Sequence, residues 1–459
     1  MSSGSLIELS ALGSLDQAVA QLAGKHRISP WSGTTPSSTN FAVDYNISTL
    51  QSGKQNGPAA QEMTFKLNRA GDLCHAAVLE IRLPKLAADA SGAYVWAAGY
   101  KAVQSCKLVI GGQEIEKFSG RWLEMQSEIT QAPGIKPLRA VNKFSSISTT
   151  ELKEVGKTPE GHIVLHVPLS YYFTQSTAKA LRSVALAYHD VEFRVKLCPF
   201  ADIVTAVTHT NTAAVPVVDW GDCEIKLITG SVYLDAHERE ETARACVEQV
   251  VCMTQALTDV DSPNGRSWGS DTDFTIDNIP FNHPTRMLVV AVAQDKRLDT
   301  SANTDNYLNR GTRAAATTSV WSDDGKDCAT LPKNDFEYRL QSGTGANTVL
   351  QHSLSKIALK LNNHDRLSGD LHAGFFNTTT TAMVGYVPRS GIYVIPFSLN
   401  VRAEAGGMAV GSLNLSRVDR TSMTLTCPQQ IAGKEVFLYA SSYNVISVRN
   451  GMLGVRFSN

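Results

Sequence analysis

A long internal repeat is the feature that most constrains how this chain can fold. The segment SVALAYHDVEFRVKLC is matched more than 200 residues later by SLNLSRVDRTSMTLTC. Serine, aspartate and cysteine recur in both at the same spacing: Ser183, Asp190 and Cys198 in the first copy, and Ser412, Asp419 and Cys427 in the second. Flanking segments also match, VLHVPLS with YVIPFSL and EIKLITGS with EVFLYASS. A repeat of this length predicts two domains with the same fold.

Each copy also contains one tight turn between two alternating segments. The first copy reads KLVIGGQEIEKFSG around Gly111 and Gly112, and the second reads LKLNNHDRLSG around Asn362 and Asn363. A two-residue type I′ hairpin needs positive φ at both central residues, which glycine and asparagine tolerate best. We therefore expect a hairpin at each pair.

From residue 61 onward, apolar and polar residues alternate in short segments, a pattern typical of β-strands. Each copy holds about eight such segments joined by long connections, which suits an eight-stranded jelly roll. The sequence therefore predicts an all-β tandem double jelly roll, that is, two eight-stranded antiparallel β-sandwiches with short connecting helices. A β-propeller is disfavoured because its period is roughly 40–50 residues.

A chain of 459 residues is too long for a single hydrophobic core, so we expect more than one domain. The residue pattern along the chain indicates where these domains begin and end. Segment 235–250 reads as a hinge helix because it is rich in charge and lacks glycine and proline. A second short helix is expected at 121–129. The expected parts are an N-terminal arm at 1–60, a first jelly roll at 61–236, a second at 237–459, and exposed insertions at 256–275 and 295–335.

Composition excludes several classes of function. The formal net charge is −1 and the isoelectric point is about 6.8, so no basic excess exists to bind a phosphate backbone. The longest apolar run, 287–293, is far shorter than the roughly 20 residues of a membrane span. The N-terminus lacks a secretory signal. The eight cysteines stand singly without a C-x-x-C pair, which indicates buried, reduced thiols in a protein made in the cytosol.

A search for catalytic motifs finds none of the H-E-x-x-H, G-x-S-x-G or P-loop patterns. His162 and His166 lie four residues apart, but their segment alternates like a strand. His364 and His372 flank Asp365 and Asp370, but the RLSG residues between them belong to the repeated turn, so a metal site is not favoured there. A jelly-roll enzyme of the cupin type would need a His-x-His pair, which is missing from the sequence. We therefore expect no enzymatic activity, no metal and no cofactor.

Many short motifs, in order, resemble those of the major capsid proteins of nucleocytoplasmic large DNA viruses, the group that includes irido-, phyco- and marseilleviruses. The resemblance runs from about Leu12 to the C-terminus. The chain departs from the family pattern at 241–245 and at Pro396, which affects loop contacts only. The matching motifs are TNFA at 39–42, RAGDL at 69–73, VIGGQEI at 109–115, GRWLE at 120–124, AYHDV at 187–191, YLD at 233–235, ERE at 238–240, VEQV at 247–250, LN at 361–362 with DR at 365–366, GIY at 391–393, GSLNLSRVD at 411–419, YNV at 443–445 and GM at 451–452.

The resemblance implies a non-enzymatic major capsid protein whose homotrimers form pseudo-hexameric capsomers of an icosahedral shell. It implies partners in the neighbouring capsomers, in minor capsid proteins, and in the inner membrane or its proteins through the arm. The protein would be made in the host cytoplasm and reside in the virion. The motif positions expected to hold the fold are Gly111, Gly112, Asp190, Asn362, Asn363, Asp365, Arg366, Ser416, Arg417 and Asp419.

One alternative from another class is a carbohydrate-binding attachment protein, since a jelly roll alone does not determine function. Such a protein presents aromatic side chains on exposed loops. Trp268 and Trp321, one in each predicted insertion, are the candidates.

Overall fold

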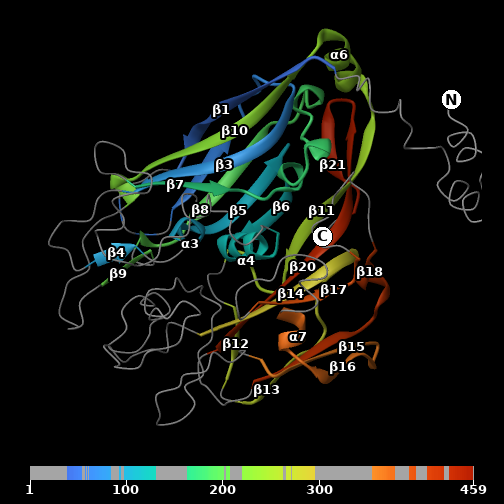
Figure 1. Cartoon of the computed structure of the whole chain (residues 1–459). Helices are drawn as coiled ribbons and strands as arrows, with labels where there is room; N and C mark the ends of the chain where they lie inside the picture. The colour runs from blue at the N-terminus through green and yellow to red at the C-terminus, as the bar shows by residue number, and fades with distance from the viewer. Residues whose placement is uncertain are drawn as a thin grey trace, which may run out of the picture. The chain divides into compact units, whose positions relative to one another are not determined.

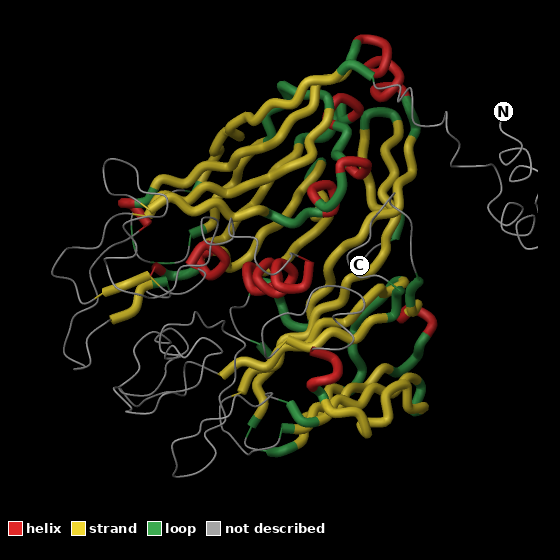
Figure 2. Tube along the Cα trace, viewed as in Figure 1, coloured by secondary structure: helices red, strands yellow, loops and turns green. Residues whose placement is uncertain are grey.

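The computed structural model consists of two compact units, residues 1–41 and residues 42–459. The residues that the structure describes are 39–53, 57, 59, 61–83, 92–94, 98–130, 163–200, 203–206, 220–261, 265–269, 271–294, 354–377, 392–399, 411–427 and 434–457. None of the helices within these ranges is long and apolar enough to cross a membrane. Strands dominate and the helices are short (Figure 2).

Eight strands form the first jelly roll, in the hydrogen-bonded order β6-β5-β8-β2-β1-β10-β3-β7. Strands β1 and β2 pair only between residues 49–52 and 64–66, with a register shift, so one layer passes into the other at this corner. Figure 1 shows β1, β10, β3 and β7 as one layer. The bounds are β1 (Phe41–Ser52), β2 (Glu62–Lys66), β3 (Leu73–Leu83), β5 (Val103–Ile110), β6 (Gln113–Ser119), β7 (Ile163–Pro168), β8 (Val191–Leu197) and β10 (Glu224–Leu234).

Side chains that alternate strictly between buried and half-buried positions form the core between these layers. Strand β8, VEFRVKL, buries every second residue, because successive side chains of a strand point to opposite faces. Aromatic rings fill the centre: Tyr171 lies 5.6 Å from Phe193 and 5.7 Å from Phe173, between ring centroids. These pairs have the spacing at which aromatic rings attract one another.

The second jelly roll repeats the same strand order. One layer is β16-β15-β19-β13, and the other is β17-β14-β20-β11, extended by β12, β18 and β21. These layers correspond strand for strand to β6-β5-β8-β2 and β7-β3-β10-β1. The bounds are β11 (Val247–Ala256), β12 (Arg266–Trp268), β13 (Asp273–Ile276), β14 (Pro284–Gln294), β15 (Lys356–Leu361), β16 (His364–His372), β17 (Ile392–Pro396), β18 (Leu413–Asn414), β19 (Thr421–Thr426), β20 (Lys434–Arg449) and β21 (Met452–Val455).

Helices and a small ribbon connect the strands. Helix α4 fulfils the expectation of a helix at 121–129. Strands β4 and β9 pair with each other. The bounds are α3 (Ala98–Ala102), α4 (Gly120–Thr130), α6 (Ala236–Arg244), α7 (Gly374–Asn377), β4 (Gly92–Tyr94), β9 (Val204–Ala206), and the 3₁₀ turns η2 (Tyr172–Thr174), η3 (Thr177–Lys179), η4 (Ser183–Ala185), η6 (Trp220–Asp222) and η10 (Leu415–Arg417).

The two predicted hairpin turns are present. Gly111 and Gly112 have φ of 60° and 81°, and they join β5 to β6. Asn362 and Asn363 have φ of 49° and 63°, and they join β15 to β16. The two domains thus make the same turn with different residues.

The repeat is out of register with the sequence match by one residue at β8 and β19. The Gly111 N–H donates to the Asp190 carbonyl at 2.9 Å, whereas the Asn362 N–H donates to the Arg420 carbonyl at 2.8 Å. Asp190 therefore corresponds to Arg420 and not to Asp419. The shift is required because the buried face of β19 begins at Thr421, and a slip of one residue would turn every side chain to the other face.

One sheet of the second jelly roll is buried on both faces. In β14, Leu288, Val290 and Val292 pack into the core of the second jelly roll. The alternate residues, Met287, Val289 and Ala291, join the apolar cluster of the first jelly roll. The continuous apolar run at 287–293 is therefore a strand between two cores.

Three predicted boundaries are wrong. The arm does not extend to residue 60, because β1 pairs with β2 and β10; apolar and polar residues alternate in β1, but its apolar residues lie on an exposed face. The hinge helix ends at Arg244, and 247–250 pairs with β20 because the sheet supplies hydrogen-bond partners there. Insertion 256–275 is not an exposed loop, since β12 and β13 lie within it and pair with β20 and β19. Insertion 295–335 lies outside the described residues.

Candidate functional site

Two junctions and a polar clamp join the jelly rolls of the chain, and these contacts are the candidate functional site. We define the hinge junction as the Gly111–Gly112 turn, His189 and the Asn450–Gly451 turn. The Tyr188 N–H donates to the Gly451 carbonyl at 3.1 Å, and the Leu453 N–H donates to His189 Nδ1 at 3.2 Å. The turn between β20 and β21 is thereby held against the loop before β8.

Asp190 connects the loop before β8 to the end of β2 and the residues that follow it. Its carboxylate accepts hydrogen bonds from Lys66 Nζ at 2.8 Å and from Arg69 at 3.1 Å. Arg69 also donates to the carbonyl of His189. The hydrogen bond from Lys66, together with the charges of Lys66 and Arg69, holds the pKa of Asp190 below its usual value. The carboxylate is about half exposed, so its ion pairs mainly position the loop.

Asp72, from the same RAGDL segment, ties the first jelly roll to the hinge helix. Its buried carboxylate accepts the Leu234 N–H at 2.9 Å and pairs with Arg239 Nε at 2.9 Å. Leu234 ends β10 and Arg239 lies on α6. The motifs that carry the family resemblance therefore meet at the point where the first jelly roll ends.

We define the α4 junction as the contact of β6 and α4 with the outward face of β14 and β20. Ser119 Oγ and the Tyr439 hydroxyl are hydrogen-bonded at 2.8 Å, and the ring of Trp122 lies 5.1 Å from that of Tyr439. The guanidinium of Arg121 lies 4.3 Å from the ring centroid of Phe437 and 3.7 Å from the carboxylate of Glu435. Ring contacts and a cation over an aromatic face therefore hold the two jelly rolls together at this junction.

Asp261 adds a polar clamp between the jelly rolls. Its carboxylate accepts hydrogen bonds from Lys107 Nζ at 2.5 Å and from Ser105 Oγ at 2.7 Å, and its carbonyl accepts one from the Gln104 amide at 2.5 Å. Burial would raise the pKa of Asp261, but these hydrogen bonds and the Lys107 charge outweigh it and lower the pKa. The pKa of Lys107 is raised, because the bond and charge of Asp261 outweigh the effect of burial.

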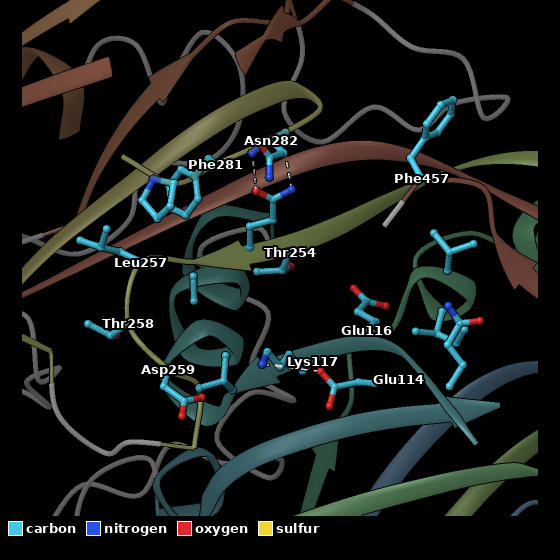
Figure 3. Close-up of a pocket in the computed structure, with 17 residues that line it drawn as sticks. Glu114, Glu116, Lys117, Thr254, Leu257, Thr258, Asp259, Phe281, Asn282 and Phe457 are labelled. Atoms are coloured by element: carbon cyan, nitrogen blue, oxygen red, sulfur yellow. Dashed lines mark hydrogen bonds and ion pairs between the residues drawn. The ribbon is translucent and has the colours of Figure 1, made fainter. Parts of the chain in front are cut away.

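A cavity of about 670 Å³ lies between β6 and the segment that follows β11. Charged residues of β6 line one side, and Phe281 and Asn282 lie on the other (Figure 3). The side chain of Gln255 accepts from the Asn282 N–H at 2.9 Å and donates to its carbonyl at 3.1 Å. Over the part of the chain that the structure describes, no three side chains are grouped as metal ligands. The cavity is therefore lined by side chains of mixed polarity.

The ten predicted motif positions form two sets, one in each jelly roll. Gly111, Gly112 and Asp190 meet at the hinge junction. In the second set, the Asn362 side chain accepts the Arg420 N–H at 3.0 Å, and Ser416 Oγ accepts the His283 N–H at 2.7 Å. The rest of that set is exposed: Asn363, Asp365 with Lys360 at 3.6 Å, Arg366, Arg417 and Asp419.

Sequence reasoning missed Asp261, Tyr439 and Phe437. No motif marks them, since their partners lie more than 150 residues away. Two of the histidines weighed as metal ligands have other partners: His166 lies 3.3 Å from Glu80, and His372 Nδ1 accepts the Gly374 N–H. His364 is exposed. His162 lies outside the described residues.

The attachment alternative loses one of its two aromatic candidates. Trp268 is buried, stacks on Phe274 at 5.4 Å and donates its indole N–H to the Asp271 carbonyl. The prediction that Trp268 is exposed is wrong, because β12 pairs with β20. Trp321 lies outside the described residues.

Comparison with known proteins agrees with this architecture. Residues 29–235 match the family described as "Major capsid protein N-terminus", and residues 238–454 match "Large eukaryotic DNA virus major capsid protein". The major capsid protein of Phaeocystis pouchetii virus is 24% identical, and that of Paramecium bursaria Chlorella virus 1 is 23% identical; each match covers 99% of this chain and 100% of the relative.

Solved structures show the same fold. The PBCV-1 capsid matches with a TM-score of 0.66 at 20% identity, covering 94% of this chain and 100% of the other. The Faustovirus major capsid protein matches with a TM-score of 0.60 at 10% identity, covering 96% of each chain. The two family matches meet at the hinge helix and together span almost the whole chain. The chain belongs to the major capsid proteins of large eukaryotic DNA viruses.

Proposed function

We propose that this chain is the shell-forming subunit of a large double-stranded DNA virus, and that three copies form a pseudo-hexagonal capsomer that tiles an icosahedral capsid. The observation that carries the proposal is the presence of two jelly rolls with identical strand order in one chain. Three such chains supply six similar domains. A threefold ring then has a nearly sixfold outline, which can pack edge to edge in a shell.

The junctions support this role, because a shell subunit must keep its two domains in one fixed relation. The α4 junction buries aromatic rings, and the Asp261 clamp adds three hydrogen bonds beside it. A net charge of −1 allows identical units to pack densely without long-range repulsion.

The further partners in the proposal are neighbouring capsomers, minor capsid proteins, and the inner membrane or its proteins through the N-terminal arm. Direct binding of nucleic acid is not part of it, since the chain lacks a basic excess. Synthesis takes place in the host cytoplasm, and the capsid shell is the final location. The proposal assigns no enzymatic activity.

The mass of the purified protein in solution tests the proposal. Light scattering coupled to size exclusion should give three times the chain mass of 49.6 kDa. Electron microscopy of concentrated protein should show flat arrays of threefold particles. A stable monomer that binds glycans and never forms arrays would instead favour an attachment protein.

A further inference from the structure

The cavity between β6 and the segment after β11 is bordered by the edges of two strands. Its lining includes every residue of 113–117 on β6, and every residue of 254–260, which comprises the end of β11 and the residues after it. Because successive side chains of a strand point to opposite faces, a wall formed by one face would include only every second residue. The unbroken runs therefore indicate that the cavity follows strand edges.

The edge of β11 that borders the cavity is open. Among the described residues, β11 forms its ladder with β20, on the other edge. The Leu257 N–H donates to the carbonyl of Leu438 on β20 at 2.9 Å. The backbone groups of an antiparallel strand point alternately to its two edges, so those of Thr254 and Ala256 point away from β20. Both residues line the cavity, where their N–H and C=O groups can pair with a further strand.

The side of the cavity that belongs to the first jelly roll is acidic. Glu114 is exposed, and its carboxylate lies 3.6 Å from Lys117 Nζ. Asp259 is an exposed carboxylate, and Glu116 is a buried one that accepts the Tyr172 N–H at 2.8 Å. The lining thus contains three carboxylates and one ammonium group. Its negative charge favours an occupant that carries positive charge.

The opposite side is apolar. Phe281 and Leu257 belong to the core cluster of the second jelly roll, and both line the cavity. Figure 3 shows them across the cavity from Glu114 and Lys117, with Thr254 between the two sides. An occupant beside β11 therefore meets carboxylates on one side and apolar side chains on the other.

We propose that this cavity binds an extended segment of a different protein, which adds as a strand to the open edge of β11 and carries basic and apolar residues in alternation. Its backbone pairs with Thr254 and Ala256. Since alternate residues of a strand point to opposite sides, its basic side chains face Glu114 and its apolar side chains face Phe281. Addition of a strand to an open edge is a recurring mode of peptide recognition, in which backbone hydrogen bonds supply affinity and alternate side chains supply specificity.

The size and the position of the cavity suit such a segment. Its volume of about 670 Å³ lies within the range of about 300–1,000 Å³ that is typical of ligand sites. Water can satisfy the open backbone groups when the segment is absent, so the chain folds without it. The inference rests on the proposed function, and it specifies the kind of segment by which a minor protein of the shell would be held.

Binding of labelled hexapeptides to the purified full-length protein, followed by fluorescence anisotropy, tests the proposal. The probe is Lys-Val-Lys-Val-Lys-Val. Its controls are Glu-Val-Glu-Val-Glu-Val and a Lys-Val peptide whose backbone nitrogens are methylated. We expect the Glu-Val peptide to bind about tenfold more weakly because the lining is acidic. The methylated peptide should also bind about tenfold more weakly, because it cannot donate backbone hydrogen bonds.

Three variants locate the binding. Glu114→Lys should remove the preference for the Lys-Val peptide, whereas Glu241→Lys, on an exposed residue of α6 outside the cavity, should retain it. Ala256→Pro should weaken the binding of both peptides, because it removes an N–H that points into the cavity. This N–H makes no bond to β20, and proline is tolerated at such open edges.

Four results would overturn the site: no binding of the Lys-Val peptide, equal binding of the Glu-Val peptide, equal binding of the methylated peptide, or a preference that survives in Glu114→Lys. Should Ala256→Pro melt below wild type, Glu114→Lys decides, since Glu114 is exposed. The mass of the same preparation separates this inference from the proposed function. A trimer that fails to bind the peptide overturns the site alone, and a monomer overturns the proposed capsomer.

Discussion

The turn shared by the two domains allows a quantitative test of the duplication. Gly112 has φ of 81°, a left-handed backbone that is costly for residues with a β-branch. A Cβ at this position would have no atom within 4 Å, so substitution changes backbone strain and little else. For Gly112→Val we expect a loss of about 1–2 kcal/mol in folding free energy. The expected fall in melting temperature is about 2–4 °C for each kcal/mol in a domain of 150–250 residues.

Gly112→Asn is the matched control, because the second domain uses Asn363 at the equivalent position with φ of 63°. Asparagine tolerates this region, so its melting temperature should stay close to that of wild type. Gly111→Asn should differ, although Asn362 occupies the equivalent position in the other turn. A Cβ on Gly111 would lie 2.6 Å from the His189 ring of the hinge junction, which must then move.

Thermal melting of the three variants beside wild type, followed by circular dichroism, is the assay. The expected order of melting temperature places Gly112→Asn near wild type, with Gly112→Val and Gly111→Asn both lower. Equal melting of Gly112→Val and Gly112→Asn would refute the reasoning from φ. A silent Gly111→Asn would refute the packing of His189 on the turn.

Three further predictions concern the junctions and the arm. Asp261→Asn should cost about 1–3 kcal/mol in urea unfolding near neutral pH, since it weakens the bonds from Lys107 and Ser105. The pKa of Asp261 is lowered in the folded state, so its contribution to the free energy of unfolding is full above the unfolded pKa of about 3.9. That contribution is lost as the pH falls through the folded pKa. A stability difference between variant and wild type that persists in strong acid would contradict this. Asp72→Ala should expose α6 to proteolysis faster than wild type, because Arg239 and the Leu234 N–H lose their acceptor; an unchanged cleavage rate would argue against that tether. Deletion of residues 1–40 should leave a folded trimer that assembles poorly under the electron microscope, and an unfolded product would disprove the arm's peripheral role.

The strand pattern, the turns and the duplication could be predicted from the sequence, because each is visible in short segments of it. The turns depend on two neighbouring residues whose φ must be positive, and Gly111–Gly112 and Asn362–Asn363 both meet that need. Helix α4 was likewise visible as a short segment without alternation.

Only the tertiary structure shows which part of the chain packs on each face of a strand. Alternation shows that a residue faces one side of a sheet, but the partner on that side comes from a distant part of the chain. Strand β14 is apolar on both sides because two domains pack on it, and β1 directs its apolar row outward, away from the domain that contains it. Trp268 was expected on an exposed loop and is buried, because its segment pairs with the edge of β20. The sequence by itself determined that two jelly rolls form, and the tertiary structure decided which faces join them and which remain open, because burial depends on contacts between segments far apart in the chain.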